Sequence, residues 1–233
     1  MPPTTVLPFS YANKQLKSNE NFRFPRMCDL VSDYKNATEP LYIVCDPKEF
    51  SAEKEGTDLS TNVIKGGNFG DNFFISGAHT IAKGGNGSDS FFLRPNHPSS
   101  MVYANGYKGA DRYIVGGEKI CPGNIVIEDY LGGPNGEPNE AHILPGSGFS
   151  AQLRGDTKGF NISLYGKDWR RDSKQDGTLE YLLPNGANVK WTNVNTGDTF
   201  SYNHDVVNKI TIQEDISKAP VPEGSELIPP EKK

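Results

Sequence analysis

Three short segments of this 233-residue chain repeat one another, and their spacing constrains the fold more than any other feature. Each segment has glycines, then an aspartate, then a pair of large apolar or aromatic residues; the segments lie at 66–74, 84–92 and 106–114. The aspartates Asp71, Asp89 and Asp111 are separated by 18 and then 22 residues. A period near 18 residues is too short for helical repeats and suits one coil of a β-solenoid, with two turns and two short strands.

The residues after each aspartate predict the interior of this solenoid. In a strand, alternate side chains share one face, so we expect a core of Phe73, Ile75, Phe91, Leu93, Tyr113 and Val115. Phe74, Phe92 and Ile114 then form a second apolar row on the outer face. We expect the first 60 residues or the region 131–215 to cover this row; if the row is exposed instead, it marks a partner interface.

The rest of the chain divides by composition. Residues 1–61 are a mixed segment expected to pack on the roll at 62–130, and the proline-rich residues 216–233 read as a disordered tail or linker. Residues 131–215 hold short alternating runs between turn signals, which favours antiparallel hairpins. The predicted fold is mainly β: a short right-handed parallel β-roll or solenoid followed by an antiparallel β region.

The repeat also has a recognisable chemistry. Segment 84–92 fits the nonapeptide G-G-x-G-x-D-x-U-x, with U a large apolar residue, at every fixed position; Phe69 and Tyr107 are the single departures in the other two copies. The pattern resembles the calcium-binding repeats of RTX (repeats-in-toxin) proteins, whose nonapeptides wind into a parallel β-roll. The resemblance implies Ca²⁺ held between stacked turns by Gly66, Gly67, Asp71, Gly84, Gly85, Gly87, Asp89, Gly106, Gly109 and Asp111.

These residue types suit calcium, which takes six to eight oxygen ligands from carboxylates and backbone carbonyls. Stacked carboxylates repel one another without a cation, so binding and folding should be coupled. The alternative that Asp, Asn and Gly simply make good turns stays open. Asp129 lies a further 18 residues along but follows no glycine loop, so we expect it at a solvated strand end rather than as a ligand.

Charge and hydrophobicity argue against two classes of protein. The net charge of −5 argues against nucleic-acid binding by bulk charge, and no apolar run is long enough to cross a membrane. The resemblance implies a non-catalytic calcium-binding module of a larger secreted bacterial toxin, effector or adhesin, extracellular or delivered into a host cell. Its partners would be other domains of the same polypeptide, a host surface protein or a glycan.

Two alternatives remain. The first is a metal-free structural β-solenoid that serves as an interaction domain. The second is a β-solenoid polysaccharide lyase or hydrolase, for which Asp89, Arg94, Asp111 and Arg112 are the residues to suspect. No motif brings an acid, a base and a nucleophile together, so the sequence favours a protein without catalysis but leaves that question open.

Overall fold

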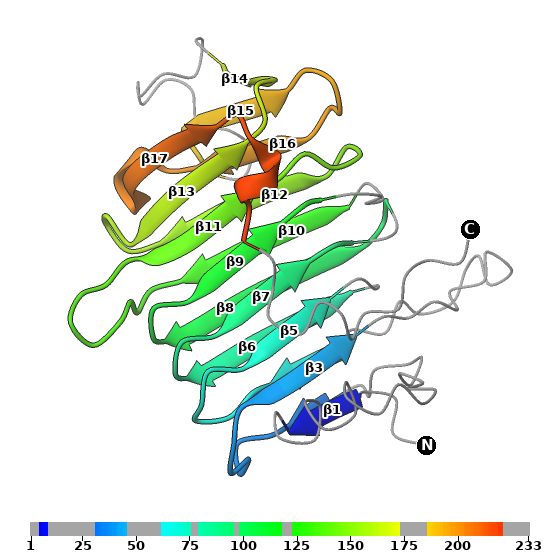
Figure 1. Cartoon of the computed structure of the whole chain (residues 1–233), viewed down its shortest axis with the longest axis vertical. Helices are drawn as coiled ribbons and strands as arrows, with labels where there is room; N and C mark the ends of the chain where they lie inside the picture. Colours follow the sequence, from blue (N-terminus) through cyan, green and yellow to red (C-terminus); the bar gives the residue numbers. More distant parts are fainter. Residues whose placement is uncertain are drawn as a thin grey trace, which may run out of the picture.

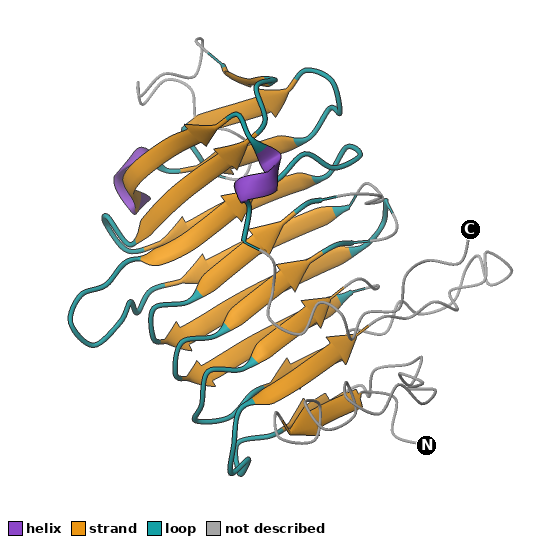
Figure 2. Ribbon diagram, viewed as in Figure 1, coloured by secondary structure: helices purple, strands orange, loops and turns teal. Residues whose placement is uncertain are grey.

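The chain winds into a β-solenoid in which successive strands alternate between two sheets (Figure 1). This computed structural model describes residues 5–8, 31–45, 62–75, 79–95, 98–117, 123–172 and 186–220. Strands dominate these residues (Figure 2), and the helices among them are two short 3₁₀ turns, His204–Val206 (η2) and Ile216–Lys218 (η3).

The first sheet contains every second strand of the solenoid. Its order is β1 (Thr5–Pro8), β3 (Leu41–Cys45), β5 (Asn72–Ile75), β7 (Ser90–Leu93), β9 (Arg112–Val115), β11 (Asn139–Ile143), β13 (Phe160–Tyr165) and β17 (Val207–Gln213). All neighbours pair in parallel except β1 and β3, which are antiparallel.

The second sheet holds the intervening strands. From one end its order is β2 (Val31–Asp33), β4 (Asn62–Lys65), β6 (Thr80–Asn86), β8 (Met101–Lys108), β10 (Asn124–Asp129), β12 (Ser150–Gly155), β16 (Thr199–Tyr202), β15 (Val189–Asn193) and β14 (Trp169–Arg171). Pairing is parallel from β2 to β16 and antiparallel from β16 to β14.

The expected order, a parallel solenoid followed by antiparallel strands, is confirmed, but the solenoid is longer than expected. Within 131–215, β11, β12, β13, β16 and β17 continue the parallel coils, and only the β14–β15–β16 pairing is antiparallel. At the other end, β2 and β3 already form a coil before residue 62. Alternating polarity identifies a strand but not its direction, which depends on the connection and the neighbour. Residues 221–233 and most of residues 1–61 lie outside the described residues. The disordered tail or linker and the packing of residues 1–61 on the roll therefore stay predictions.

An aromatic stack fills the interior behind the repeats. Phe73, Phe91 and Tyr113 pair in register across β5, β7 and β9, and all three are fully buried. The rings of Phe73 and Phe91 stack with centroids 4.6 Å apart, and those of Phe91 and Tyr113 at 5.0 Å. Across the core, the second sheet contributes small side chains, including Ala82 and Ala104. The predicted core is therefore confirmed.

The second apolar row is also buried. Phe74, Phe92 and Ile114 are at most 6% exposed, so they do not form an exposed interface in this chain. The guanidinium of Arg94 lies over the Phe92 ring, 3.8 Å from its centroid. The prediction that residues 131–215 cover this row is wrong for the described strands of that region. Those strands extend the two sheets of the solenoid instead of packing over the row.

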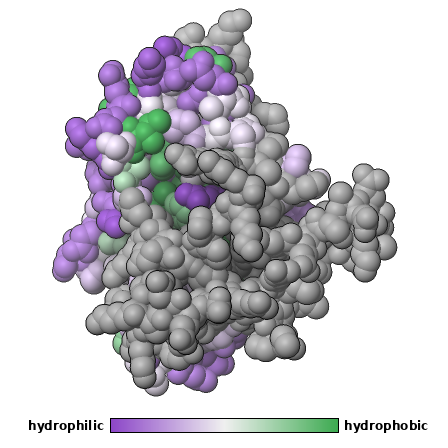
Figure 3. Space-filling model, turned by 45° about the vertical axis from the view of Figure 1, so that its right-hand side comes forward, coloured by the Kyte–Doolittle hydropathy of each residue, from purple (hydrophilic) through white to green (hydrophobic). Residues whose placement is uncertain are grey.

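Most of the described surface in Figure 3 is hydrophilic; apolar atoms gather mainly in a patch at the upper left, with smaller apolar spots elsewhere. The larger exposed apolar side chains toward the end of the solenoid include Ile210 and Ile212 of β17 and Ile216 of η3. In the described ranges, no helix has both the length and the apolar character that crossing a bilayer requires.

Candidate functional site

The three repeat aspartates lie above one another, as the sequence predicts. The loops that connect β4 to β5, β6 to β7 and β8 to β9 stack along one edge of the solenoid (Figure 1). Asp71, Asp89 and Asp111 each precede the first-sheet strand of their coil and are at most 1% exposed. We call these three residues the aspartate column.

Hydrogen bonds connect the column from coil to coil. The backbone N–H of Asp71 donates to Asp89 Oδ1, and that of Asp89 donates to Asp111 Oδ1, both at 2.7 Å. The N–H of Asp111 donates to Asn139 Oδ1 at 2.9 Å, and the N–H of Leu41 donates to Asp71 Oδ1 at 2.9 Å. One oxygen of each carboxyl group therefore holds a neighbouring coil in place.

The second carboxyl oxygens differ in their surroundings. Asp71 Oδ2 accepts the backbone N–H of Gly67 at 2.7 Å. Asp89 Oδ2 and Asp111 Oδ2 are buried, and neither accepts a hydrogen bond from an N–H group or a hydroxyl of the described residues. The carboxyl groups of Asp111 and Asp129 lie close enough to share a proton in a side-chain hydrogen bond. A buried acceptor without a partner is costly, which makes these two oxygens the least satisfied atoms of the column.

The glycine that opens each repeat makes room for these oxygens. A Cβ on Gly84 would lie 1.9 Å from Asp89 Oδ2 and 2.8 Å from the carbonyl oxygen of Gly106. A Cβ on Gly66 would lie 2.5 Å from Asp71 Oδ2 and 2.3 Å from the carbonyl oxygen of Gly84. In two successive coils, a carboxyl oxygen and a carbonyl oxygen of the next coil thus converge on the same small space.

The other repeat glycines are explained by the backbone. Gly85, Gly87 and Gly109 have φ of +121°, +115° and +142°, a region that residues with a Cβ rarely adopt. A Cβ on Gly109 would also lie 1.9 Å from the carbonyl oxygen of Gly87 in the coil below. Close stacking of the loops therefore requires these glycines whether or not a metal binds.

Asp129 is a member of the site that the sequence prediction placed wrongly. It is 1% exposed, and its Oδ2 accepts the hydroxyl of Tyr113 at 2.7 Å. That hydroxyl accepts the backbone N–H of Gly106 at 2.6 Å. The alternation of β10 could have revealed the inward position, since Ile125 and Ile127 point into the core and Asp129 follows at the same spacing.

Burial and mutual repulsion disfavour the charged forms of these acids. Burial, opposed by the backbone hydrogen bond from Asp71 and reinforced by the charges of Asp111, Asp71 and Asp129, raises the pKa of Asp89 to about 9. Burial and the neighbouring Asp129 raise the pKa of Asp111 to about 8. Burial also raises the pKa values of Asp71 and Asp129. At neutral pH Asp89 and Asp111 therefore keep protons or are neutralised by a cation.

The donor set fits a hard cation such as Ca²⁺. The available atoms are oxygens: Asp89 Oδ2, Asp111 Oδ2 and loop carbonyls such as that of Gly106. Within the described ranges, no group of three His, Cys, Asp or Glu side chains is arranged to hold a metal. Backbone carbonyls would therefore have to supply the remaining ligands, as the glycine loops allow.

The residues suspected for a lyase or hydrolase do not gather at one surface. Asp89 and Asp111 point into the solenoid, and Arg94 lies over Phe92. The side chain of Arg112 is exposed, and its Nε donates to Glu140 at 2.9 Å. These four residues therefore form no common substrate-facing group.

Comparison of the chain with protein-family models, with curated proteins and with solved structures found no match. The interpretation of the site consequently depends on its own geometry.

Proposed function

We propose that this chain is a non-catalytic, RTX-like calcium-binding β-solenoid module whose folding is coupled to Ca²⁺. The observation that carries the proposal is the pair of buried oxygens on successive coils, Asp89 Oδ2 and Asp111 Oδ2, which no N–H group or hydroxyl of the described residues reaches. A cation beside them would supply the missing partner and offset the repulsion among the stacked carboxylates.

The chemistry of the loops supports calcium over transition metals. The converging atoms are carboxyl and carbonyl oxygens, and none of the described residues buried at this edge carries a thiol or an imidazole. Asp89 and Asp111, with the carbonyls of their glycine loops, are the residues that would hold the ion. By the RTX resemblance, we further propose a place in a secreted bacterial toxin, effector or adhesin, next to other domains or a host surface.

A metal-free structural solenoid is the second candidate, and one observation favours it. Asn139 accepts the backbone N–H of Asp111 just as Asp111 accepts that of Asp89, so a neutral amide can perform the same structural role. In this case the column is held by hydrogen bonds alone, and Asp89 and Asp111 stay protonated.

Thermal unfolding in EDTA and in millimolar CaCl₂ separates the two candidates, with calorimetric titration of Ca²⁺ as a direct measure of binding. Calcium should raise the melting temperature of the wild type and bind measurably. Asp89→Asn should lose both effects, whereas the exposed control Asp156→Asn should keep them. A wild type whose melting is indifferent to calcium, with no binding heat, would leave the metal-free solenoid as the function.

A further inference from the structure

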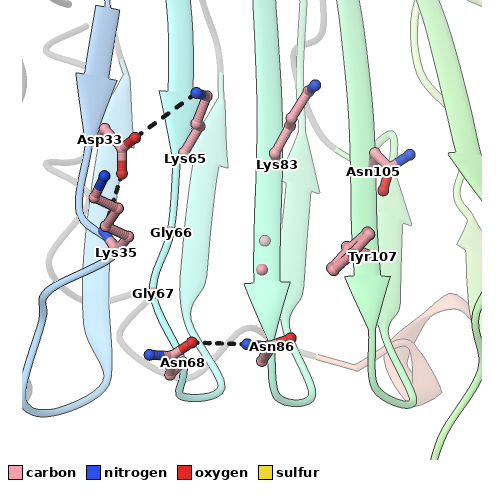
Figure 4. Close-up of a pocket in the computed structure, with 12 residues that line it drawn as sticks. Asp33, Lys35, Lys65, Gly66, Gly67, Asn68, Lys83, Asn86, Asn105 and Tyr107 are labelled. Atoms are coloured by element: carbon pink, nitrogen blue, oxygen red, sulfur yellow. Dashed lines mark hydrogen bonds and ion pairs between the residues drawn. The ribbon is translucent and has the colours of Figure 1, made fainter.

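A separate feature lies on the outer face of the second sheet, away from the interior of the loops. Here a hollow of about 430 Å³ opens over the paired glycines Gly66–Gly67 and Gly84–Gly85 (Figure 4). Because two neighbouring coils carry no side chains at this position, their bare backbone forms the floor. The volume falls within the range of about 300–1,000 Å³ found for small-molecule sites. We call this hollow the glycine groove.

Tyr107 ends the groove in the third coil. It pairs in register with Gly85 and takes the place of the glycine in the other two repeats. Its φ is 80°, a strained conformation for a bulky residue, and it is 50% exposed. Strain of this kind persists where the surrounding structure imposes it, and it concentrates at functional sites. The aromatic ring is therefore the first indication that the groove has a ligand.

The charge of the groove is opposite to that of the chain. Lys35, Lys65 and Lys83 line it together with the single acid Asp33, whereas the chain carries a net charge of −5. Lys65 lies 3.7 Å from Asp33, but among the described residues no acid pairs with Lys83. Figure 4 shows Lys65 and Lys83 projecting side by side from neighbouring strands. A negatively charged ligand group would find an ammonium available there.

Amide side chains complete the lining. Asn86 Nδ2 donates to Asn68 Oδ1 at 2.7 Å along the exposed edge of the groove, and Asn105 lies beyond Lys83 on the next strand (Figure 4). Amides bind hydroxyl groups as donors and acceptors, and an aromatic face accepts the C–H face of a sugar ring. A bare inorganic anion would use the lysines but has no use for the ring, whereas an acidic sugar uses all three kinds of group.

We propose that the glycine groove binds an acidic sugar unit of a glycan. The sugar ring lies against Tyr107, its carboxylate or sulfate pairs with the ammonium of Lys83, and its hydroxyls bind Asn86 and Asn105. The groove lies on the outside of the sheet, so this proposal does not depend on calcium in the aspartate column.

Calorimetric titration of the full chain tests the groove, in the buffer that gives the highest melting temperature. The probes are the tetrasaccharides of hyaluronan, which carries carboxylates, and of chondroitin 4-sulfate, which also carries sulfates. Chitotetraose is the neutral comparison and sodium sulfate the bare anion. The variants are Lys83→Gln and Tyr107→Gly, and the control is Lys209→Gln, an exposed lysine on β17 of the other sheet.

We expect at least one acidic tetrasaccharide to bind, and both groove variants to weaken its affinity by about tenfold or more. Tyr107→Gly restores the glycine of the other copies and relieves the strained φ, so it should melt no lower than the wild type while losing affinity. Lys209→Gln should bind normally. The proposal fails if neither acidic probe binds, if chitotetraose binds equally well, if both groove variants bind like the wild type, or if millimolar sulfate displaces the sugar completely.

Discussion

Replacing Asp89 by asparagine should stabilise the calcium-free protein at neutral pH, although it alters a buried residue of the repeat. The folded state raises the pKa of Asp89 from an ordinary value near 3.9 to about 9. Because the folded protein holds the proton and the unfolded chain releases it, stability falls as the pH rises from about 4 towards 9.

The magnitude follows from the pH interval. A pH of 7 lies about 3 units above the pKa of Asp89 in the unfolded chain. At ~1.4 kcal/mol per unit, holding this proton in the folded state lowers the free energy of unfolding by on the order of 4 kcal/mol. Asparagine needs no proton and keeps the oxygen that accepts the N–H of Asp71. Its new buried N–H₂ group costs about 1–2 kcal/mol of this gain. The net stabilisation is on the order of 2 kcal/mol, or roughly 4–8 °C in melting temperature for a chain of this size.

The assay is thermal unfolding followed by circular dichroism at pH 5, 7 and 8.5, in EDTA and in CaCl₂. In EDTA, wild-type stability should fall across this series, and Asp89→Asn should fall less steeply. Calcium should stabilise the wild type most at the highest pH, since it competes with protons for the carboxylates, and should leave Asp89→Asn unchanged. If Asp89→Asn is less stable than the wild type at every pH in EDTA, the inferred burial of an uncompensated carboxyl group is wrong.

Three further changes test the packing of the same region. Gly84→Ala places a Cβ 1.9 Å from Asp89 Oδ2 and should lower the free energy of unfolding, measured by urea titration, by several kcal/mol. The control Gly186→Ala should lose much less, because its Cβ meets nothing within 4 Å and only the φ of +83° is unfavourable. Phe91→Ala removes the middle ring of the aromatic stack and should lower the free energy of unfolding by about 3–5 kcal/mol. Phe69 is 38% exposed, so Phe69→Ala should change it by less than about 0.5 kcal/mol. Equal losses in the two variants would contradict the assignment of Phe91 to the core. Tyr113→Phe leaves the N–H of Gly106 without its acceptor and Asp129 without its donor, so it should lower stability by about 1–3 kcal/mol; an unchanged urea midpoint would mean that this hydroxyl is not needed.

The repeat predicted the central coils because it carries two independent signals. The spacing of Asp71, Asp89 and Asp111 set the coil length, and the alternation after each aspartate set the face that enters the core. Both signals are local, so they do not depend on knowing which distant strand is the neighbour.

The remaining features depend on contacts that no local pattern encodes. The direction of β11 and β13 follows from their pairing with β9 and β17. The coil from Asp111 to Asn139 spans 28 residues, well beyond the period of 18 to 22 residues in the earlier coils. Asp129 enters the site from the opposite strand of the coil, where the earlier copies have glycine. The sequence shows Tyr107 as a departure from the repeat, but its place at the end of a groove depends on its register with Gly85.

The hairpin of β14 and β15 has a consequence for self-association. A stack of parallel strands can in principle grow without limit, because its last strand presents the same unpaired groups as the one before it. At β16 the neighbouring strand β15 runs in reverse, and the short strand β14 follows it. On this sheet the hairpin therefore ends the run of parallel strands, whereas the other sheet ends in β17, which still runs parallel to its neighbour β13.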